Sequence, residues 1–418
     1  MSKADLRIGL LGPFGFGNLG DAAIQEAAIY NIRERIPGGA IVGYSLNPSD
    51  TEKRHGIRAF PIKDPYSFQA SARVDRSPHR NRLLDSAVRK VSKIPSELKF
   101  TLASYRSLDE IDWLVVSGGG QLDDYWGGPW QHPFRLFKWT SMARRRGIKV
   151  IFLSVGAGSI DSPLSKFFIK TALKSAAYRS YRDDYTLGYL QQMGVSREAD
   201  PVIPDLAYSH PIEGCHELER GRSDQGNSSD AFPMVGIGPM AYFDPRAWPE
   251  KNQQIYHRYL EQLSGFVEWL VSRSYRVVLF PGGAVADRGA IQDLKQKLDL
   301  RQVGFSARID DPVIESVDDL LRTIIRTDLV VATRLHSVIL AHLCSKPVLA
   351  LSYHQKVSAV MDDMGHSEYC LDVQSIDTET LIHSFQRLEG SRALLSSQIK
   401  ERIGGYRREL AAQYDSVF

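Results

Sequence analysis

Short apolar runs alternate with longer segments of mixed polarity through the first half of the chain. Residues 7–11, 40–46, 113–117 and 149–154 are apolar runs of strand length, and residues 22–36, 134–146 and 164–177 have the pattern of helices. Strands separated by helices in this way form right-handed βαβ units with parallel strands. The first half of the chain is therefore predicted to fold around a mostly parallel sheet.

The same pattern restarts after a polar stretch at residues 211–231, which is rich in Gly, Ser, Asn and Asp and is typical of a linker. Strands are predicted at 234–238, 276–280, 328–332 and 348–353, and helices at 253–273 and 335–343. We therefore predict an α/β fold of two facing, doubly wound domains. The N-terminal domain covers 1–210, the linker 211–231, the C-terminal domain 232–375, and C-terminal helices follow over 376–418.

The composition is that of a globular protein and narrows the classes of function. Of 418 residues, 43% are hydrophobic and 24% are charged, so sizeable cores can form. The formal net charge of +3 is too small to indicate a nucleic-acid-binding protein by itself. The three cysteines lack the spacing of a metal site or a disulfide framework, which favours inert thiols in a reducing compartment. Since no signal-peptide pattern and no apolar run of bilayer length is visible, we expect a cytoplasmic protein.

Residues 69–100 depart from this average because they carry a local excess of basic side chains. One interpretation is a solvated insertion. The other is a patch that contacts anionic lipid, or a lipid-linked substrate, at the inner face of the membrane. The basic residues are Arg73, Arg76, Arg80, Arg82, Arg89, Lys90, Lys93 and Lys99, against the acids Asp75, Asp85 and Glu97.

A glycine-rich loop with Gly15, Gly17 and Gly20 joins the first predicted strand to the first helix. Glycines let backbone N–H groups approach a ligand closely, and a helix start favours an anion. Asp21 has the residue type of an N-cap. The spacing imitates a dinucleotide-binding fingerprint, but the second strand ends in Asn47-Pro48 without the acidic residue that binds a ribose. A tight strand-to-helix turn is the alternative interpretation.

A second glycine run, at residues 118–120, follows the apolar strand at 113–117, where open α/β sheets bind ligands. Two acids beside three aromatic residues suit a sugar, because carboxylates accept hydroxyl protons and rings stack on C–H faces. An ordinary surface loop is the alternative. The adjacent acids lack further spaced ligands, so no metal site is predicted. These five residues are Asp123, Asp124, Tyr125, Trp126 and Trp130.

The strongest local site lies at Arg334 and His336, which follow a predicted strand and open a helix. The guanidinium binds carboxylate or phosphate with two parallel hydrogen bonds, and the imidazole suits proton transfer. Lys356 follows the next strand and adds a third cation at the same sheet edge. Arg182 also stands at a strand end, where it binds an anion or forms a structural ion pair. His342 and His354 are interpreted as ordinary helix and loop residues.

Taken in chain order, these motifs resemble those of the polysaccharide pyruvyl transferase family. They run in family order from Gly15 to Gly365, although Ala22 and Gln121 depart from the family pattern and weaken the prediction for the acceptor. The matching segments are Gly15-Phe-Gly-Asn-Leu-Gly-Asp21, Ser117-Gly-Gly-Gly-Gln-Leu-Asp-Asp124, Ser180-Tyr-Arg-Asp183, Ala199-Asp-Pro-Val-Ile-Pro-Asp205, Arg334-Leu-His336, Lys346-Pro347 and Ser352-Tyr-His-Gln-Lys-Val357.

The resemblance implies two Rossmann-like domains of the glycosyltransferase-B type. It also implies phosphoenolpyruvate as the donor and a sugar of a polysaccharide or its precursor as the acceptor, with a pyruvate ketal as product. In the family, the arginines of the matching motifs hold the donor, which carries over to Arg182, Arg334 and His336. No cofactor is expected besides phosphoenolpyruvate as co-substrate. The remaining predicted donor contacts are Gly17, Asn18, Gly119, Gly120, Leu335 and Lys356.

The predicted chemistry assigns a role to each side chain. His336 delivers a proton to the donor, Arg334 clamps it, and a carboxylate, Asp21 or Asp123, deprotonates the sugar. Asp123, Asp124 and Trp126 are the predicted acceptor contacts. Two alternatives remain: a glycosyltransferase that uses a sugar nucleotide on the same fold, and a non-catalytic glycan-binding relative.

Overall fold

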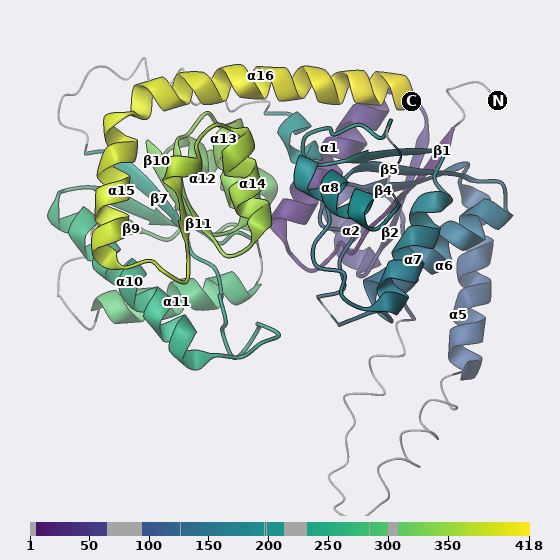
Figure 1. The fold of residues 1–418 in the computed structure, drawn as a ribbon, viewed down its shortest axis with the longest axis horizontal. Helices are drawn as coiled ribbons and strands as arrows, with labels where there is room; N and C mark the ends of the chain where they lie inside the picture. Colours follow the sequence, from purple (N-terminus) through teal and green to yellow (C-terminus); the bar gives the residue numbers. More distant parts are fainter. Residues whose placement is uncertain are drawn as a thin grey trace, which may run out of the picture. The chain divides into compact units, whose positions relative to one another are not determined.

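A computed structural model describes most of the chain and shows two α/β units (Figure 1). The described residues are 6–64, 94–125, 127–195, 197, 199–212, 232–283, 285–299 and 308–418. Trp126, nearly all of the predicted linker and most of the basic stretch at 69–100 lie outside them. The chain forms two compact units, Met1–Phe16 with Arg33–Tyr181 and Thr186–Pro201, and Gly17–Ile32 with Arg182–Tyr185 and Val202–Phe418.

The first unit is built on a six-stranded parallel sheet with the strand order β3-β2-β1-β4-β5-β6. This is the order of a doubly wound, Rossmann-like sheet. The strands are β1 (Arg7–Leu11), β2 (Ala40–Ser45), β3 (Ala59–Pro61), β4 (Trp113–Ser117), β5 (Lys149–Val155) and β6 (Tyr178–Tyr181).

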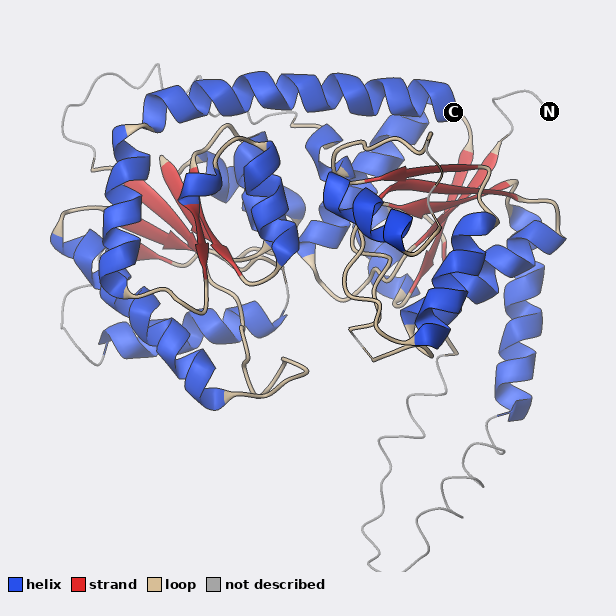
Figure 2. Ribbon diagram, viewed as in Figure 1, coloured by secondary structure: helices blue, strands red, loops and turns tan. Residues whose placement is uncertain are grey.

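Helices pack around this sheet, as Figure 2 shows in blue against red strands. Trp139 and Tyr44 are fully buried in the core, and each satisfies its polar atom by donating to a backbone oxygen, of Ile62 and Ser107 respectively. The helices are α2 (Pro48–His55), α5 (Ile94–Ser107), α6 (His132–Arg145), α7 (Pro163–Lys174) and α8 (Asp184–Gln192). The helix α1 (Leu19–Arg35) begins in the second unit and ends in the first.

The second unit repeats the same architecture with the strand order β12-β11-β10-β7-β8-β9, again all parallel. Its strands are β7 (Met234–Gly238), β8 (Arg276–Leu279), β9 (Ile309–Asp310), β10 (Leu329–Ala332), β11 (Val348–Ser352) and β12 (Cys370–Asp372). Its helices are α10 (Gln253–Ser272), α11 (Val285–Asp299), α12 (Val317–Ile325), α13 (Leu335–Leu343), α14 (Gln355–Asp363), α15 (Thr378–Gly390) and α16 (Arg392–Val417), with the short 3-10 helices η3 (Leu206–Ser209) and η5 (Ser367–Tyr369).

In each sheet the order of successive strands reverses between two neighbouring strands, β1 and β4 in the first unit and β7 and β10 in the second. Ligands of open α/β sheets bind beyond the carboxyl ends of the strands at such a reversal. The first glycine loop and residues 118–120 follow β1 and β4, and Thr333-Arg334 follows β10. The predicted motifs therefore lie where each sheet is suited to hold a ligand.

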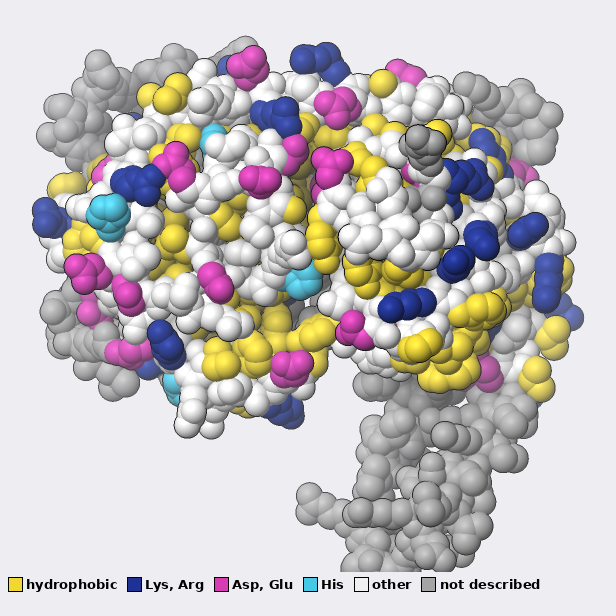
Figure 3. Space-filling model, in the orientation of Figure 1, with side chains coloured by type: hydrophobic (Ala, Val, Ile, Leu, Met, Phe, Trp, Pro, Cys, Tyr) yellow, Lys and Arg dark blue, Asp and Glu magenta, His cyan; other side chains and the backbone are white. Residues whose placement is uncertain are grey.

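The predicted fold class, an α/β fold of two Rossmann-like domains with parallel sheets, is confirmed. No helix within the described ranges is both long and apolar enough to cross a membrane. Charged side chains are scattered among hydrophobic and other side chains on the face seen in Figure 3.

Candidate functional site

The residues that begin α13 are held in place by buried polar contacts within the second unit. Arg334 precedes the helix in an extended conformation, and Leu335, in the first turn, is buried. The Thr333 hydroxyl lies 2.9 Å from the Tyr259 hydroxyl, which accepts a hydrogen bond from the backbone of Met240. The strand end and the helix start are therefore fixed to each other before any ligand is considered.

Asp287 holds the guanidinium of Arg334 in two parallel hydrogen bonds. Nε of Arg334 donates to Oδ2 at 2.9 Å, and Nη2 donates to Oδ1 at 2.8 Å. Asp287 itself is fully buried in the first turn of α11. Burial lowers the pKa of Arg334, but the Asp287 carboxylate outweighs this and raises it above the ordinary value. The arginine thus stays charged and fixed in orientation.

The backbone at Gly282 leaves the room that this arginine needs. A Cβ atom there would lie 2.4 Å from Cγ of Arg334 and 2.9 Å from Oγ of Ser337. Such contacts are too short for any side chain, so the position requires glycine. Gly282 lies in the loop that follows the strand β8, and Arg334 packs against this loop.

His336 and Arg182 meet at a second buried carboxylate, Asp205. Nη1 of Arg182 donates to Oδ2 of Asp205 at 3.3 Å, and Nε donates to Asp183 at 3.2 Å. Nε2 of His336 lies 3.7 Å from the same Oδ2, too far for a hydrogen bond, and bonds to no other described residue. A buried nitrogen without a hydrogen-bond partner is unusual in a native protein and marks His336 as a candidate for ligand contact.

These neighbours set the charge state of Asp205. Burial alone raises the pKa of its carboxyl group, but His336 and Arg182 outweigh this effect and hold it at about 2. For Arg182, burial lowers the pKa, but the charges of Asp183 and Asp205 outweigh this effect and raise the pKa above its ordinary value. The pair therefore stays ionised throughout the neutral range.

The start of α1 packs against His336. A Cβ atom at Gly20 would lie 2.2 Å from Nδ1 of His336, so only glycine allows this approach. The prediction that Asp21 caps α1 is wrong, because the helix begins at Leu19. Asn18 precedes it instead, and its side chain accepts a hydrogen bond from the backbone of Gly20 at 3.0 Å.

Asp21 lies within the first turn of α1 and is only partly exposed. Its Oδ2 accepts a hydrogen bond from the Asn18 side chain at 2.9 Å. Burial raises the pKa of Asp21, while the positive charges of His336 and Lys356 lower it to a smaller degree. Carboxyl groups with opposite pKa shifts, Asp21 raised and Asp205 lowered, are typical of acid–base sites.

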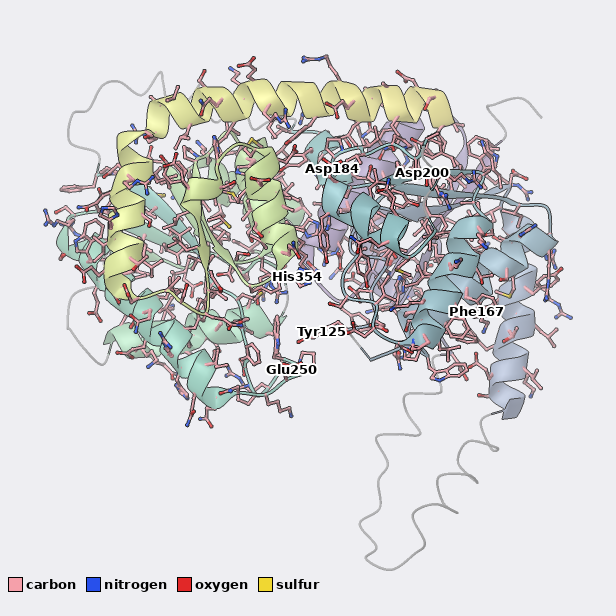
Figure 4. All side chains as sticks on the ribbon, viewed as in Figure 1. Tyr125, Phe167, Asp184, Asp200, Glu250 and His354 are labelled. Atoms are coloured by element: carbon pink, nitrogen blue, oxygen red, sulfur yellow. The ribbon has the colours of Figure 1, made fainter. Side chains whose placement is uncertain are left out.

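Lys356 lies in the first turn of α14 and belongs to the same cluster as Arg182, Arg334 and His336. Its ammonium lies 5.2 Å from the centre of the Tyr353 ring. His354, labelled in Figure 4, is the N-cap of α14 and accepts a hydrogen bond from the backbone of Lys356 at 3.2 Å. Burial and the charges of Lys356 and Arg182 lower the pKa of His354 to about 4. The neutral ring therefore has a structural role that the interpretation as a loop residue did not include.

The cations of this cluster are largely balanced by acids, since burying an unpaired charge is costly. Arg334 pairs with Asp287, and Arg182 pairs with two carboxylates. What remains for a ligand are the N–H groups that no described residue engages, on Nη1 of Arg334 and Nη2 of Arg182. The site can bind an anion through directed hydrogen bonds more than through net positive charge.

A cavity of about 930 Å³ adjoins this cluster on the side of Arg182. Arg334 and His336 do not line it. Its volume is that of a small-ligand pocket, and its carboxylates suit hydroxyl groups better than anions. The lining includes Arg182, Asp183, Asp184, Tyr185, Asp205, His354, Asp362, Asp363, Asp372, Tyr406 and Glu409.

The second glycine loop belongs to the first unit and has a separate network. Gly118 and Gly119 have positive φ angles of 55° and 71°. Asp124 accepts hydrogen bonds from the backbone of residues 161 and 162, at 3.2 and 3.0 Å, and so orients that loop. Gln121, which departs from the family pattern, is buried and pairs with Nε2 of His132 at 2.8 Å.

The predicted residues thus fall into two groups by unit. Gly17, Asn18, Asp21, Arg182, Arg334, Leu335, His336 and Lys356 belong to the second unit, and Gly119, Gly120, Asp123 and Asp124 to the first. Sequence reasoning missed Asp287 and gave Asp205 no role of its own. The available signal for Asp287 was its position a few residues after the strand β8 and Pro281-Gly282-Gly283, at the start of a helix.

Asp205→Asn is expected to lower the free energy of unfolding at pH 7 by roughly 2 kcal/mol, the value of a pKa depressed to about 2. Because the folded-state pKa is depressed, the stabilisation is present above the unfolded pKa and is lost as the pH falls from about 4 towards 2. Urea unfolding at pH 7 and pH 3 measures the difference from wild type, which should narrow at pH 3.

The exposed Asp318 is the matched control, since its ion pair with Arg322 lies on the surface. Asp318→Asn should change the free energy of unfolding by less than about 0.5 kcal/mol. A deficit of Asp205→Asn that is the same at both pH values would contradict the assigned ionisation.

Solved structures of similar fold cover nearly the whole chain at low sequence identity. A UDP-GlcNAc 2-epimerase from Neisseria meningitidis, bound to UDP-GlcNAc, has a TM-score of 0.57 and 12% identity, with 94% of both chains covered. Anabaena Alr3699/HepE in complex with UDP-glucose has a TM-score of 0.54 and 15% identity, with 99% of this chain and 100% of that chain covered. MurG from Acinetobacter baumannii has 0.53 and 12%, with 99% of both covered. At these identities the similarity shows the fold alone.

The family comparison matches the description polysaccharide pyruvyl transferase over residues 18–355. The matched range begins at Asn18 and contains Arg182, Arg334 and His336, and Lys356 lies one residue beyond it. Since the match covers well over half of the chain, the chain belongs to the polysaccharide pyruvyl transferase family.

Proposed function

We propose that the protein transfers the three-carbon group of phosphoenolpyruvate to two hydroxyls of one sugar, forming a pyruvate ketal on a polysaccharide or its precursor. The observation that carries this proposal is the buried Nε2 of His336, which bonds to no described residue and lies 3.7 Å from Asp205. An acid beside two fixed arginines is what the protonation of a small enol phosphate with two anionic groups requires.

The donor carries a carboxylate and a phosphate, and each suits a guanidinium fork. Arg334 and Arg182 are already held by Asp287 and Asp205, so their remaining N–H groups point in fixed directions. The start of α13, where the N-cap residue makes no side-chain cap hydrogen bond, adds backbone N–H donors for anionic oxygens. We assign Lys356, Gly17 and Asn18 to the same donor pocket.

The reaction needs one proton delivered and two removed. His336 delivers a proton to the methylene carbon, which becomes a methyl group and leaves positive charge on the neighbouring carbon. A sugar hydroxyl adds to that carbon and loses its proton, phosphate leaves with its bonding electrons, and a second hydroxyl adds and loses its proton. Asp21, whose pKa is raised by burial, is the base that we assign to a hydroxyl.

The acceptor is a glycan, as the family membership indicates. We assign its contacts to the second glycine loop, Gly119 and Gly120, with Asp123 and Asp124. Asp124 accepts hydrogen bonds from two backbone N–H groups, which hold its side chain in place.

His336→Ala is expected to lower the turnover number by about 10²- to 10⁴-fold, because a positioned general acid contributes that much. Phosphate release from phosphoenolpyruvate, with a panel of 4-nitrophenyl glycosides as acceptors, gives the rate, and proton NMR of the ketal methyl group identifies the product. The exposed His257, on α10, is the matched control, and His257→Ala should keep the wild-type rate. Wild-type turnover in His336→Ala would refute the acid role.

The same assay separates this reaction from glycosyl transfer. If wild type releases no phosphate with any acceptor but transfers sugar from a nucleotide donor, the protein is a glycosyltransferase and the proposal is wrong. A protein that binds glycans and turns over neither donor would support a non-catalytic relative.

The pH dependence tests the role of Asp21. A base must be deprotonated, so kcat/KM should fall as the pH drops through the raised pKa of Asp21, which lies above the ordinary value for aspartate. Asp21→Asn should lower kcat/KM and remove this acidic limb of the profile. The exposed Asp161→Asn serves as the control. An acidic limb that persists unchanged in Asp21→Asn would assign the base elsewhere.

A further inference from the structure

Five aromatic rings form a continuous cluster on the first unit, in the loop before α6 and on α6 and α7. Phe168 is its centre, with ring centroids 5.7 Å from Trp130, 5.4 Å from Phe134, 5.1 Å from Phe137 and 5.8 Å from Phe167. We call these five residues the aromatic face. It takes no part in the site proposed above.

Two members of the aromatic face are open to solvent. Trp130 is 63% exposed and Phe167 is 56% exposed, although the ring of each contacts the buried Phe168. Figure 4 labels Phe167 on α7. Large rings held rigidly at the surface are costly to leave in water, and a cluster of them marks an interaction surface.

Basic side chains border the aromatic face. Lys166, Lys170 and Lys174 repeat every four residues along α7 and therefore form one stripe, and Arg144 and Arg145 are exposed at the end of α6. No carboxylate within the described ranges pairs with any of these five. Figure 3 shows the same arrangement, a hydrophobic patch over α6 and α7 with a row of Lys and Arg beside it.

A groove of about 1050 Å³ links the rings to further cations. Trp130, Phe134 and Phe137 line it together with Arg135, Lys138, Arg144 and Arg145. Its acids are Asp64 and Glu97, and Glu97 is paired with Lys138 at 3.0 Å. Asp161, two residues before α7, is a third acid near this surface and is exposed. The surface is therefore apolar at its centre and positive around it.

We propose that the aromatic face docks on an anionic lipid bilayer. Trp and Phe insert at the boundary between headgroups and acyl chains, and Lys and Arg beside them attract acidic headgroups. A second copy of the chain fits less well, because a symmetric contact would bring the unpaired lysines and arginines of both copies together. The proposal does not depend on the reaction.

The test is co-sedimentation of the full chain with vesicles of phosphatidylcholine, alone or mixed with phosphatidylglycerol. Wild type should bind the mixed vesicles and lose affinity as salt is added. Trp130→Ser with Phe167→Ser, and separately Arg144→Glu with Arg145→Glu, should each weaken binding by about tenfold or more. The matched controls lie on α16: Leu394→Ser, at a residue 62% exposed, and Lys400→Glu with Arg408→Glu.

Thermal unfolding first establishes that each variant folds, which is expected for exposed positions. Wild type that fails to bind mixed vesicles would overturn the proposal. If the Trp130 and Phe167 variant and the Arg144 and Arg145 variant both bind mixed vesicles as wild type does, the proposal would also be overturned. Another segment would then hold the vesicles. Light scattering tests whether the protein forms a dimer. If wild type is a dimer that does not bind vesicles, and Trp130→Ser with Phe167→Ser dissociates it, the aromatic face would be assigned to a second copy instead.

Discussion

Asp205 is the charge on which the proposed site depends. One of its oxygens, Oδ2, lies 3.3 Å from Nη1 of Arg182 and 3.7 Å from Nε2 of His336, and its other oxygen accepts the backbone N–H of Ala207 at 3.0 Å. Without it, the buried Arg182 would keep Asp183 as its one carboxylate partner, and the acid nearest to Nε2 of His336 would be lost, which is destabilising. Asp287 has the same relation to Arg334. Arg182 and Arg334 are therefore both oriented by acids, and the proposed function uses their remaining N–H groups.

Glycine makes this arrangement sterically feasible. Gly20 lets the first turn of α1 approach His336, and Gly282 lets the loop after β8 approach Arg334. In each case a single added carbon would occupy the volume of the functional side chain. These glycines act through space on a neighbouring residue, which differs from the role of a glycine that supplies an unusual φ angle to its own loop.

Much of the fold could be predicted because buried parallel strands are apolar runs of a recognisable length. The bounds of β1, β4, β7 and α13 agree with the sequence patterns, and Arg334 and His336 could be placed at a helix start. The partners of these residues could not be predicted, since Asp287 and Arg334 are distant in sequence and meet only through the sheet order. The sequence predicts Asp21 as the N-cap of α1, three positions after Asn18. Asp and Asn are both N-cap residue types, so residue type alone does not locate the first turn. The rings of the aromatic face have the spacing of core residues, so only the structure distinguishes Phe167, which is exposed, from Phe168, which is buried.

The central claim is that the cluster around Arg334 and His336 binds phosphoenolpyruvate, and isothermal titration calorimetry tests it most directly. Wild type should bind phosphoenolpyruvate, Arg334→Ala should lose that binding, and Arg322→Ala, at an exposed arginine in the same unit, should keep it. Binding of equal strength in Arg334→Ala would place the donor elsewhere and contradict the account.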